Sequence, residues 1–281
     1  MKTEIYYFSG TGNSLLVARD IASRSGGKLI PIASFRDKES IETDADVIGI
    51  VFPVHCSSIN GVPGIVQRFA TKLGGMDSKY IFAVCTCGGF SAATIKNLGK
   101  IMESNGTTLS AGFSVQMPSN IDAVSQEEQD KLFDEWGNKL DSIYQYVTLQ
   151  NKGDYETMGL LLKVIMAPIF FYFKSKIIKF LKKYSKSSDL SFDELVAVSD
   201  RRFYTDDNCD GCGTCSRVCP VSNIKIEDDR PVWLHHCEMC MACLNWCPNG
   251  AIHGEWISKE VRYHNPDVNV ADMVDQASFK G

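Results

Sequence analysis

Two stretches of the sequence repeat one cysteine pattern, CDGCGTCSRVCP at residues 209–220 and CEMCMACLNWCP at residues 237–248. Each copy reads Cys-x2-Cys-x2-Cys-x3-Cys-Pro, and the two copies are offset by 28 residues throughout. Thiolates bind iron–sulfur clusters and zinc alike. Zinc sites usually use paired Cys-x2-Cys units, with four ligands to one ion. The third closely spaced cysteine and the Cys-Pro ending therefore favour two four-iron clusters over zinc.

The double pattern resembles the two-cluster bacterial ferredoxins, in which the fourth cysteine of each run ligates the other cluster. The resemblance implies that cluster one takes Cys209, Cys212, Cys215 and Cys247. It implies that cluster two takes Cys237, Cys240, Cys243 and Cys219. Each half thus completes the other's site, and the segment is too short to form a core of its own. We therefore expect loss of the clusters to unfold it.

The uneven distribution of cysteines and of charged residues divides the chain into parts. Of the 11 cysteines, only Cys56, Cys85 and Cys87 precede residue 200. Residues 1–150 carry 13 basic and 16 acidic side chains, residues 151–202 carry 10 and 6, and residues 203–281 carry 6 and 12. We interpret these parts as a globular first domain (1–150), a basic helical connector (151–202), an acidic cysteine-rich domain (203–256) and a tail (257–281). The tail shows no functional signal.

The composition of the whole chain excludes several classes of protein. A chain of 281 residues with 22% charged and 44% hydrophobic residues is not disordered. The net charge of −5 argues against nucleic acid as a partner. The first ten residues run directly into a strand-like segment without a signal peptide, so we expect a cytoplasmic protein. Thiols stay reduced in the cytoplasm, which favours metal or redox chemistry over disulfides.

The first domain alternates strand-like and helix-like segments. Apolar runs predict strands at Thr3–Phe8, Asp46–Phe52, Lys79–Cys85 and Thr108–Val115. Helical periodicity predicts helices from about residue 15 to 21 and at Val62–Leu73, Ser91–Asn105 and Gln126–Val147. Repeated strand–helix units predict an α/β fold, with helices on both faces of a parallel sheet. Ligands of such sheets bind at the carboxyl ends of the strands.

The first strand ends in a short polar loop, which consists of Ser9, Gly10, Thr11, Gly12, Asn13 and Ser14. Its glycines allow a bound group to approach the backbone closely, and the following helix adds partial positive charge. The loop has no Lys or Arg and lacks the Gly-Lys-Ser/Thr ending of a nucleotide triphosphate loop. It therefore predicts a site for one phosphate monoester, although an ordinary strand–helix turn with a capping serine has the same composition.

Residues 9–14 match, position by position, the Ser/Thr-x-Thr-Gly-x-Ser/Thr phosphate loop of flavodoxin, which the first domain resembles. The resemblance implies FMN and a five-stranded doubly wound sheet in the order 2-1-3-4-5. It places the flavin ring between residues 53–59 and 85–90. The expected ring contacts are Pro53, Val54, His55, Thr86, Cys87, Gly88, Gly89 and Phe90. His55 either contacts the flavin or is simply a loop residue. The flavin edge is expected to face the nearer cluster, because the Gly88–Gly89 loop lacks side chains that would block the approach.

The connector contains an apolar run, Met158–Phe173, followed by six lysines between residues 174 and 186. Sixteen residues are too few to span a bilayer, which needs about 20. One interpretation is that residues 158–186 lie on an anionic membrane surface. The interpretation that we favour is a helical hairpin that packs the two domains together, with Phe171, Phe173 and Phe180 at their junction.

As a whole, the chain resembles the flavodoxin–ferredoxin fusion family of anaerobic bacteria. The resemblance implies an electron-transfer flavoprotein that relays electrons between two [4Fe-4S] clusters and FMN, with donor and acceptor proteins that the sequence does not identify. The alternative is an FMN-dependent reductase of a small acceptor, such as a quinone or a nitro compound, in which the clusters act as a wire. A third possibility is a zinc-binding scaffold. No residue is singled out as catalytic.

Overall fold

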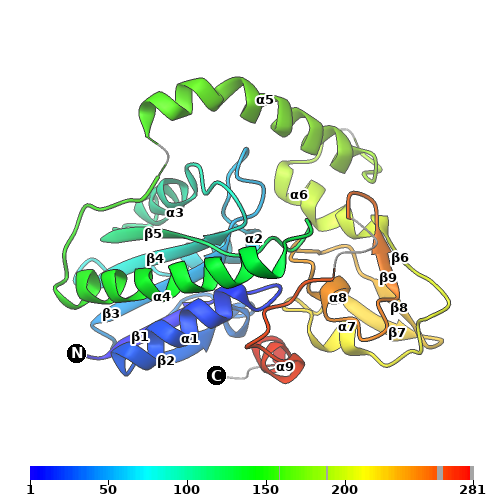
Figure 1. Cartoon of the computed structure of the whole chain (residues 1–281), viewed down its shortest axis with the longest axis horizontal. Coiled ribbons are helices and arrows are strands. Elements are labelled where there is room, and N and C mark those ends of the chain that lie inside the picture. Colours follow the sequence, from blue (N-terminus) through cyan, green and yellow to red (C-terminus); the bar gives the residue numbers. More distant parts are fainter. Residues whose placement is uncertain (158, 188, 258–261, 279–281) are drawn as a thin grey trace.

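The computed structural model describes residues 1–157, 159–187, 189–257 and 262–278. Its N-terminal half forms one five-stranded parallel sheet in the order β2-β1-β3-β4-β5 (Figure 1). The strands are β1 Thr3–Tyr7, β2 Lys28–Pro31, β3 Val47–Pro53, β4 Tyr80–Cys87 and β5 Ala111–Gln116. The helices between and after them are α1 Asn13–Ser25, α2 Gly64–Ala70, α3 Thr94–Glu103 and α4 Gln126–Thr148. The predicted α/β class and strand order are confirmed.

The predicted strands agree with β1, β3 and β4 to within two residues, and β5 begins three residues later than predicted. The sequence analysis assigned no residues to β2. This strand has only four residues, one of them Pro31, and it lies at the sheet edge, where a residue without an N–H is tolerated. Helices α1 and α4 contact each other on one face of the sheet, and α2 and α3 contact each other on the other face.

The cysteine-rich region forms two small antiparallel sheets. Strand β6 Phe203–Thr205 pairs with β9 Ile252–Gly254, and β7 Ile224–Glu227 pairs with β8 Arg230–Trp233. A one-turn helix follows the second cysteine of each motif, α7 Thr214–Arg217 and α8 Ala242–Asn245. The residues before these helices, Gly213 and Met241, both have left-handed backbone, with φ of 72° and 62°. The sequence repeat is therefore also a repeat of backbone conformation.

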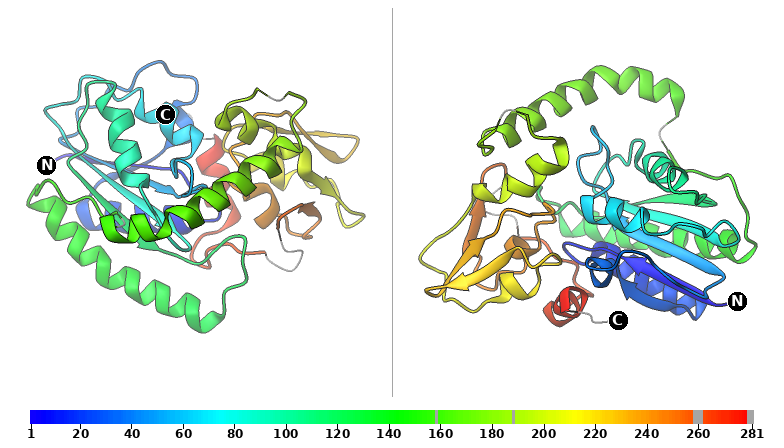
Figure 2. Two further views of the ribbon diagram at one scale, coloured as in Figure 1. Left: turned by 90° about the horizontal axis from the view of Figure 1, so that it is seen from above. Right: turned by 180° about the vertical axis from the view of Figure 1, so that it is seen from behind.

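The connector crosses above both domains as a long helix, α5 Leu160–Lys182 (Figures 1 and 2). It continues through α6 Phe192–Ala197 and a 3-10 turn, Val198–Arg202, into β6. The chain then ends in α9 Val270–Ser278, which contacts both the 3-10 turn Ile32–Phe35 and α7. One continuous hydrophobic core joins the sheet to the cysteine-rich region. In the described part of the chain, no helix is long and apolar enough to cross a membrane.

Candidate functional site

A cavity of about 620 Å³ lies at the carboxyl edge of the sheet. Its walls are Ser9, Gly10, Thr11, Asn13 and Ser14, residues 53–58, 86–90, 117–122 and 239–241, Arg202, Trp256, Ile257 and seven apolar residues of α5. The structure thus brings the predicted phosphate loop and both predicted ring loops around one cavity. Of the predicted flavin-contacting residues, only Gly12 is not part of its wall.

The carbonyl groups of the phosphate loop, residues 9–14, form hydrogen bonds on the side away from the cavity. The carbonyl oxygens of Ser9, Gly10 and Thr11 accept hydrogen bonds from Gln276 Nε2 (2.9 Å), Trp246 Nε1 (3.0 Å) and Asn265 N (2.8 Å), respectively. Several donors of the loop form no hydrogen bond within the described part of the chain. They are the N–H groups of Gly10, Thr11, Asn13 and Ser14 and the hydroxyl of Thr11. These hydrogen-bond donors are therefore available to bind an anion at the N-terminus of α1.

The residues that hold this loop come from the last part of the chain. Gln276 is fully buried and bonds both the N–H (2.8 Å) and the carbonyl of Ser9. Tyr263 donates to Asn13 Oδ1 (2.7 Å), and Asn13 Nδ2 donates to Pro118 O (3.0 Å). These contacts fix the loop from outside, so its conformation does not depend on the bound group alone. The sequence analysis missed them because isolated Asn, Gln and Tyr side chains form no periodic pattern.

The two ring loops are tied to each other and to the first helix. Val54 N donates to Thr86 O (2.8 Å), and the hydroxyls of Ser14 and Thr86 are 2.8 Å apart. Phe90 is 55% exposed at the cavity rim. Burial lowers the pKa of His55 to about 4, and a hydrogen bond to the Glu238 backbone opposes that shift only in part. His55 is therefore a neutral side chain at pH 7, placed between the cavity and the second cysteine motif.

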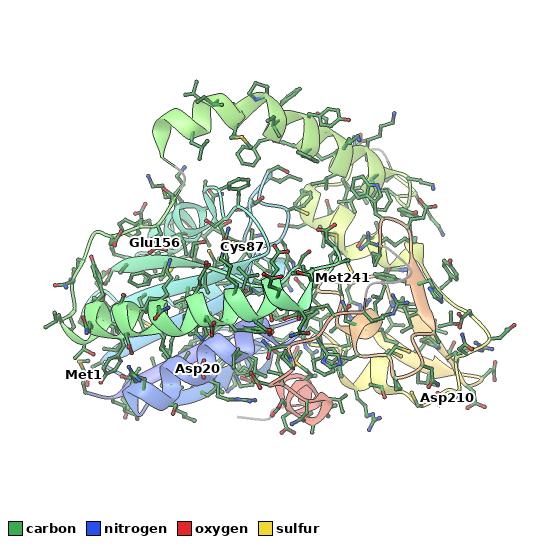
Figure 3. The ribbon with its side chains drawn as sticks, in the orientation of Figure 1. Met1, Asp20, Cys87, Glu156, Asp210 and Met241 are labelled. Carbon is green, nitrogen blue, oxygen red and sulfur yellow. The ribbon has the colours of Figure 1, made fainter. Side chains whose placement is uncertain are left out.

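The first predicted ligand set gathers at the outer end of the cysteine-rich region. Cys209, Cys212, Cys215 and Cys247 line one small cavity. Burial and then the neighbouring thiols of Cys247, Cys212 and Cys209 together raise the pKa of Cys215 to about 11. Cys247 thus lies with the first motif and not with its own. Asp210, which accepts from Cys212 N (3.1 Å), marks this end of the molecule in Figure 3.

The second predicted set gathers at the inner end, beside the large cavity. Burial raises the pKa of Cys240, and the thiols of Cys219 and Cys237 raise it further. The pKa of Cys243 is raised by burial and then by Cys237, Cys240 and Cys219. Cys219 therefore lies among the cysteines of the second motif. Within the described residues, no three His, Cys, Asp or Glu side chains are grouped to hold a single metal ion.

The inner motif packs directly on the first domain. A Cβ atom added to Gly10 would overlap the carbonyl oxygen of Cys240, so only glycine allows this approach. Glu238, between two cysteines of the motif, accepts from Ile65 N (2.8 Å) and pairs with Arg68. These contacts place the second motif against the phosphate loop, at the point between the domains where Met241 lies in Figure 3.

Arg202 is a buried cation at the same junction. It is 6% exposed and lines the large cavity. Its guanidinium lies over the rings of Phe203 (4.9 Å) and Phe180 (5.6 Å), and Nη2 is 3.6 Å from Met241 Sδ. Among the described residues, no carboxylate lies within 4 Å of it, and its Nε has no hydrogen-bond partner. A positive charge is therefore held between the cavity and the inner cysteines.

Comparisons with known proteins cover the two halves separately. Residues 208–252 match the family model described as a 4Fe-4S dicluster domain. No curated protein matches the chain. Among solved structures, a flavodoxin of Streptococcus pneumonia TIGR4 is 14% identical, covers 51% of this chain and 99% of its own, and has a TM-score of 0.33. Two-electron reduced Megasphaera elsdenii flavodoxin is 21% identical (48% and 98% covered, TM-score 0.32), and a putative quinone reductase from Klebsiella pneumoniae is 11% identical (52% and 85%, 0.34).

The chain joins a flavodoxin-like fold to a 4Fe-4S dicluster domain. The strand order, and not the TM-scores, defines the first half of this fusion. The dicluster match implies two [4Fe-4S] clusters, and the loop predicted to bind the FMN phosphate lies at the switch point between β1 and β3, where ligands of this strand order bind. The residues present fit both kinds of cofactor, because eight thiols form two groups of four and the phosphate loop has free donors.

Two expectations about the fusion need correction. Phe173 and Phe180 line the cavity, and Phe180 stacks on Trp256 at 4.2 Å, but Phe171 is 73% exposed and does not lie at the junction. The tail, which shows no functional signal in its sequence, holds the phosphate loop through Gln276 and its neighbours.

Proposed function

We propose that this protein relays electrons between two [4Fe-4S] clusters and FMN. The observation that carries the proposal is the packing of the Cys240 carbonyl on Gly10, which places one cysteine group in the wall of the cavity that the phosphate and ring loops form. When bound, the clusters exchange single electrons and FMN exchanges one or two, so their union converts one kind of transfer into the other.

The residues of the chain bind and orient these groups. Cys209, Cys212, Cys215 and Cys247 would hold the outer cluster, and Cys237, Cys240, Cys243 and Cys219 the inner one. The free N–H groups of Gly10, Thr11, Asn13 and Ser14 and the Thr11 hydroxyl would hold the FMN phosphate without a cationic side chain. Neutral His55 and the apolar side chains of α5 would exclude water from the ring. The outer group, with its exposed Cys212, would meet donor or acceptor proteins.

The phosphate site is tested by Thr11→Val, which keeps the side-chain shape and removes the hydroxyl. The loss of one hydrogen bond to a charged group costs about 1.5–3 kcal/mol. FMN affinity should therefore fall about 10- to 100-fold in a flavin fluorescence titration, while iron content stays unchanged. Riboflavin, which has no phosphate, should bind both forms equally and far more weakly than FMN binds the wild type. Equal affinity of the wild type for riboflavin and FMN would refute the phosphate site.

The relay is tested by rapid mixing with a reduced ferredoxin-type donor. Cys212→Ser alters the exposed group, away from the FMN cavity, so the variant should retain FMN but lose most of the rate of flavin reduction. Flavin extraction and complete chemical reduction with dithionite control for FMN content. If flavin reduction by the donor runs at the same rate in both proteins, the clusters are not in the path.

A second candidate function is reduction of a small apolar acceptor at the flavin. The observation that favours it is the apolar stripe of α5, which covers the cavity with Met166, Ile169, Phe170, Phe173, Ile177, Phe180 and Leu181. Such a cover suits a flat apolar ring, as in a quinone. Turnover of a water-soluble quinone by the reduced wild type should then drop when Phe173 is replaced by Asp, whereas reduction by the donor protein should not.

A further inference from the structure

The outward side of α5 exposes several large apolar side chains, which is unusual for a helix of a globular protein. The inward stripe recurs at helical spacing and lines the cavity. On the opposite side, Val164 (66%), Phe171 (73%) and Tyr172 (54%) are exposed. Among the α5 side chains that the structure describes, only Leu181 is fully buried. Exposed apolar side chains that cluster in this way usually mark an interaction surface.

The outward side of α5 also becomes positively charged toward the C-terminal end of the helix. Seven lysines and no acidic residue occur between residues 157 and 188. Lys174, Lys179 and Lys182 are exposed and share the side of Phe171 by helical periodicity. None of these three is in an ion pair with another described residue. The outward side therefore combines an apolar N-terminal half with a basic C-terminal half, in a protein whose net charge is −5.

We propose that the outward side of α5 docks this protein on an anionic lipid bilayer. Exposed aromatic and aliphatic side chains would enter the boundary between headgroups and acyl chains, and the lysines would contact anionic headgroups. A basic side with no acidic residue complements such a surface, whereas a second copy of this chain would place like charges together. The helix lies in the plane of the surface and does not cross it, in agreement with the absence of a spanning helix among the described residues.

Docking in this way would have a geometric consequence. The inward side of the same helix covers the large cavity. A helix with its side chains is about 10–12 Å across. The cavity would therefore lie one helix diameter from the lipid. The outer cysteine group, beside Asp210 at the far end of the dicluster domain in Figure 3, would remain accessible to proteins in solution.

The test is co-sedimentation of the cofactor-loaded protein with phosphatidylcholine vesicles, with and without phosphatidylglycerol. Each lysine near an anionic surface contributes about fivefold in affinity, so Lys174→Gln/Lys179→Gln/Lys182→Gln should bind on the order of 100-fold more weakly. Phe171→Ser/Tyr172→Ser should lose about tenfold. The matched control, Lys28→Gln/Lys96→Gln/Lys100→Gln, removes three exposed lysines from the first domain and should bind like the wild type.

Several outcomes would overturn the proposal. They are absence of binding at low ionic strength, equal binding to both kinds of vesicle, and equal losses in the control and in the α5 variant. Light scattering addresses the rival occupant, a second copy of the chain. A wild-type dimer that Phe171→Ser/Tyr172→Ser dissociates, together with no vesicle binding, would assign the face to dimerisation. Flavin and iron absorbance verify that each variant is folded and loaded. Vesicle binding needs no electron donor, so its failure is separate from failure of the relay.

Discussion

The two cysteine groups are copies of one sequence pattern, yet the structure gives them different surroundings. The outer group includes exposed Cys212 and lies beside the carboxylate of Asp210. The inner group includes buried Cys240 and lies beside the cation of Arg202, in the wall of the large cavity. Figure 3 shows Asp210 at the free end of the dicluster domain and Met241 at its junction with the sheet. We infer that the outer group serves exchange with other proteins and the inner group serves exchange with the flavin.

The backbone of the two motifs shows where this difference originates. Gly211 and Gly213 have left-handed backbone, and so do their repeat counterparts Met239 and Met241. Glycine is needed at 211, where a Cβ would lie 2.9 Å from the Cβ of Asp229. Methionine in this conformation costs about 1–2 kcal/mol. At the inner group, the side chains of Met239 and Met241 lie in the cavity wall. There they exclude water between the thiols and the ring loops, which offsets that cost.

The largest effect is expected when the exchange of cysteines between the motifs is broken. Cys247→Ser should abolish the outer cluster, although this residue belongs to the second motif, and Cys219→Ser should abolish the inner one. Iron and sulfide should fall from about eight to about four per chain in each variant. Electron paramagnetic resonance of the remaining cluster identifies which one was lost. If Cys247→Ser instead removes the cluster of Cys237, Cys240 and Cys243, the crossed ligand assignment is wrong.

The junction itself is tested by Gly10→Ala. The added methyl group would overlap the Cys240 carbonyl and force the inner motif away from the phosphate loop, at a cost of about 1–3 kcal/mol. The midpoint of thermal unfolding should fall, and flavin reduction by the protein donor should slow. Gly137→Ala in α4 is the matched control, because a Cβ there meets nothing within 4 Å and Gly137 is not part of the cavity wall. Equal behaviour of the two variants would mean that the Gly10 contact is not important for either property.

The sequence predicted most of the first domain, because strands buried on both faces are continuous apolar runs. Asp46–Phe52 is such a run after its first residue, and β3 lies there. The β-branched and aromatic residues of Thr3–Phe8 predict β1 in the same way. Four-residue β2 lacks this signal. The phosphate loop was predicted from a short motif. The side chains that support it, Trp246 and Gln276, were not predicted, since each acts as a single hydrogen-bonding side chain far away in sequence.

The orientation of α5 was also beyond sequence reasoning. Its apolar residues occur on both sides of the helix, so periodicity alone does not say which side is inward. Phe171 and Phe173 are two residues apart and equally apolar, yet Phe173 lines the cavity and Phe171 faces outward. Only the position of the cavity beneath the helix distinguishes them.

A smaller effect is expected when the charge beside the inner group is removed. Burial lowers the pKa of Arg202, and Cys237 and Cys243 oppose that shift only in part, but an arginine side chain is effectively always protonated at pH 7. A buried cation stabilises the reduced, more negative form of a nearby cluster, so Arg202→Met should lower the potential of the inner cluster by ~50 mV. The outer cluster should not change. Arg202→Lys, which keeps the charge, should restore most of the potential in a spectroscopic redox titration. An equal shift of both clusters would contradict the separation of the two sites.

The smallest effect is expected at Asp210, beside the outer group. Asp210→Asn keeps an oxygen to accept from Cys212 N and removes one negative charge, so the potential of the outer cluster should rise. The side chain is exposed, and exposed charges are screened within a Debye length, which is about 10 Å at 0.1 M salt. The shift should therefore be smaller than that of Arg202→Met.

The salt dependence of the two shifts in potential distinguishes Arg202 from Asp210 more clearly than the sizes of the shifts do. The shift caused by Asp210→Asn should disappear as ionic strength rises, because solvent ions reach that carboxylate. The shift caused by Arg202→Met should persist, because the guanidinium is buried against Phe203 and Phe180. Redox titrations of both variants at low and high salt measure this directly. If the Arg202→Met shift also vanishes at high salt, the inner group is reached by solvent, and it cannot be the shielded partner of the flavin that its surroundings indicate.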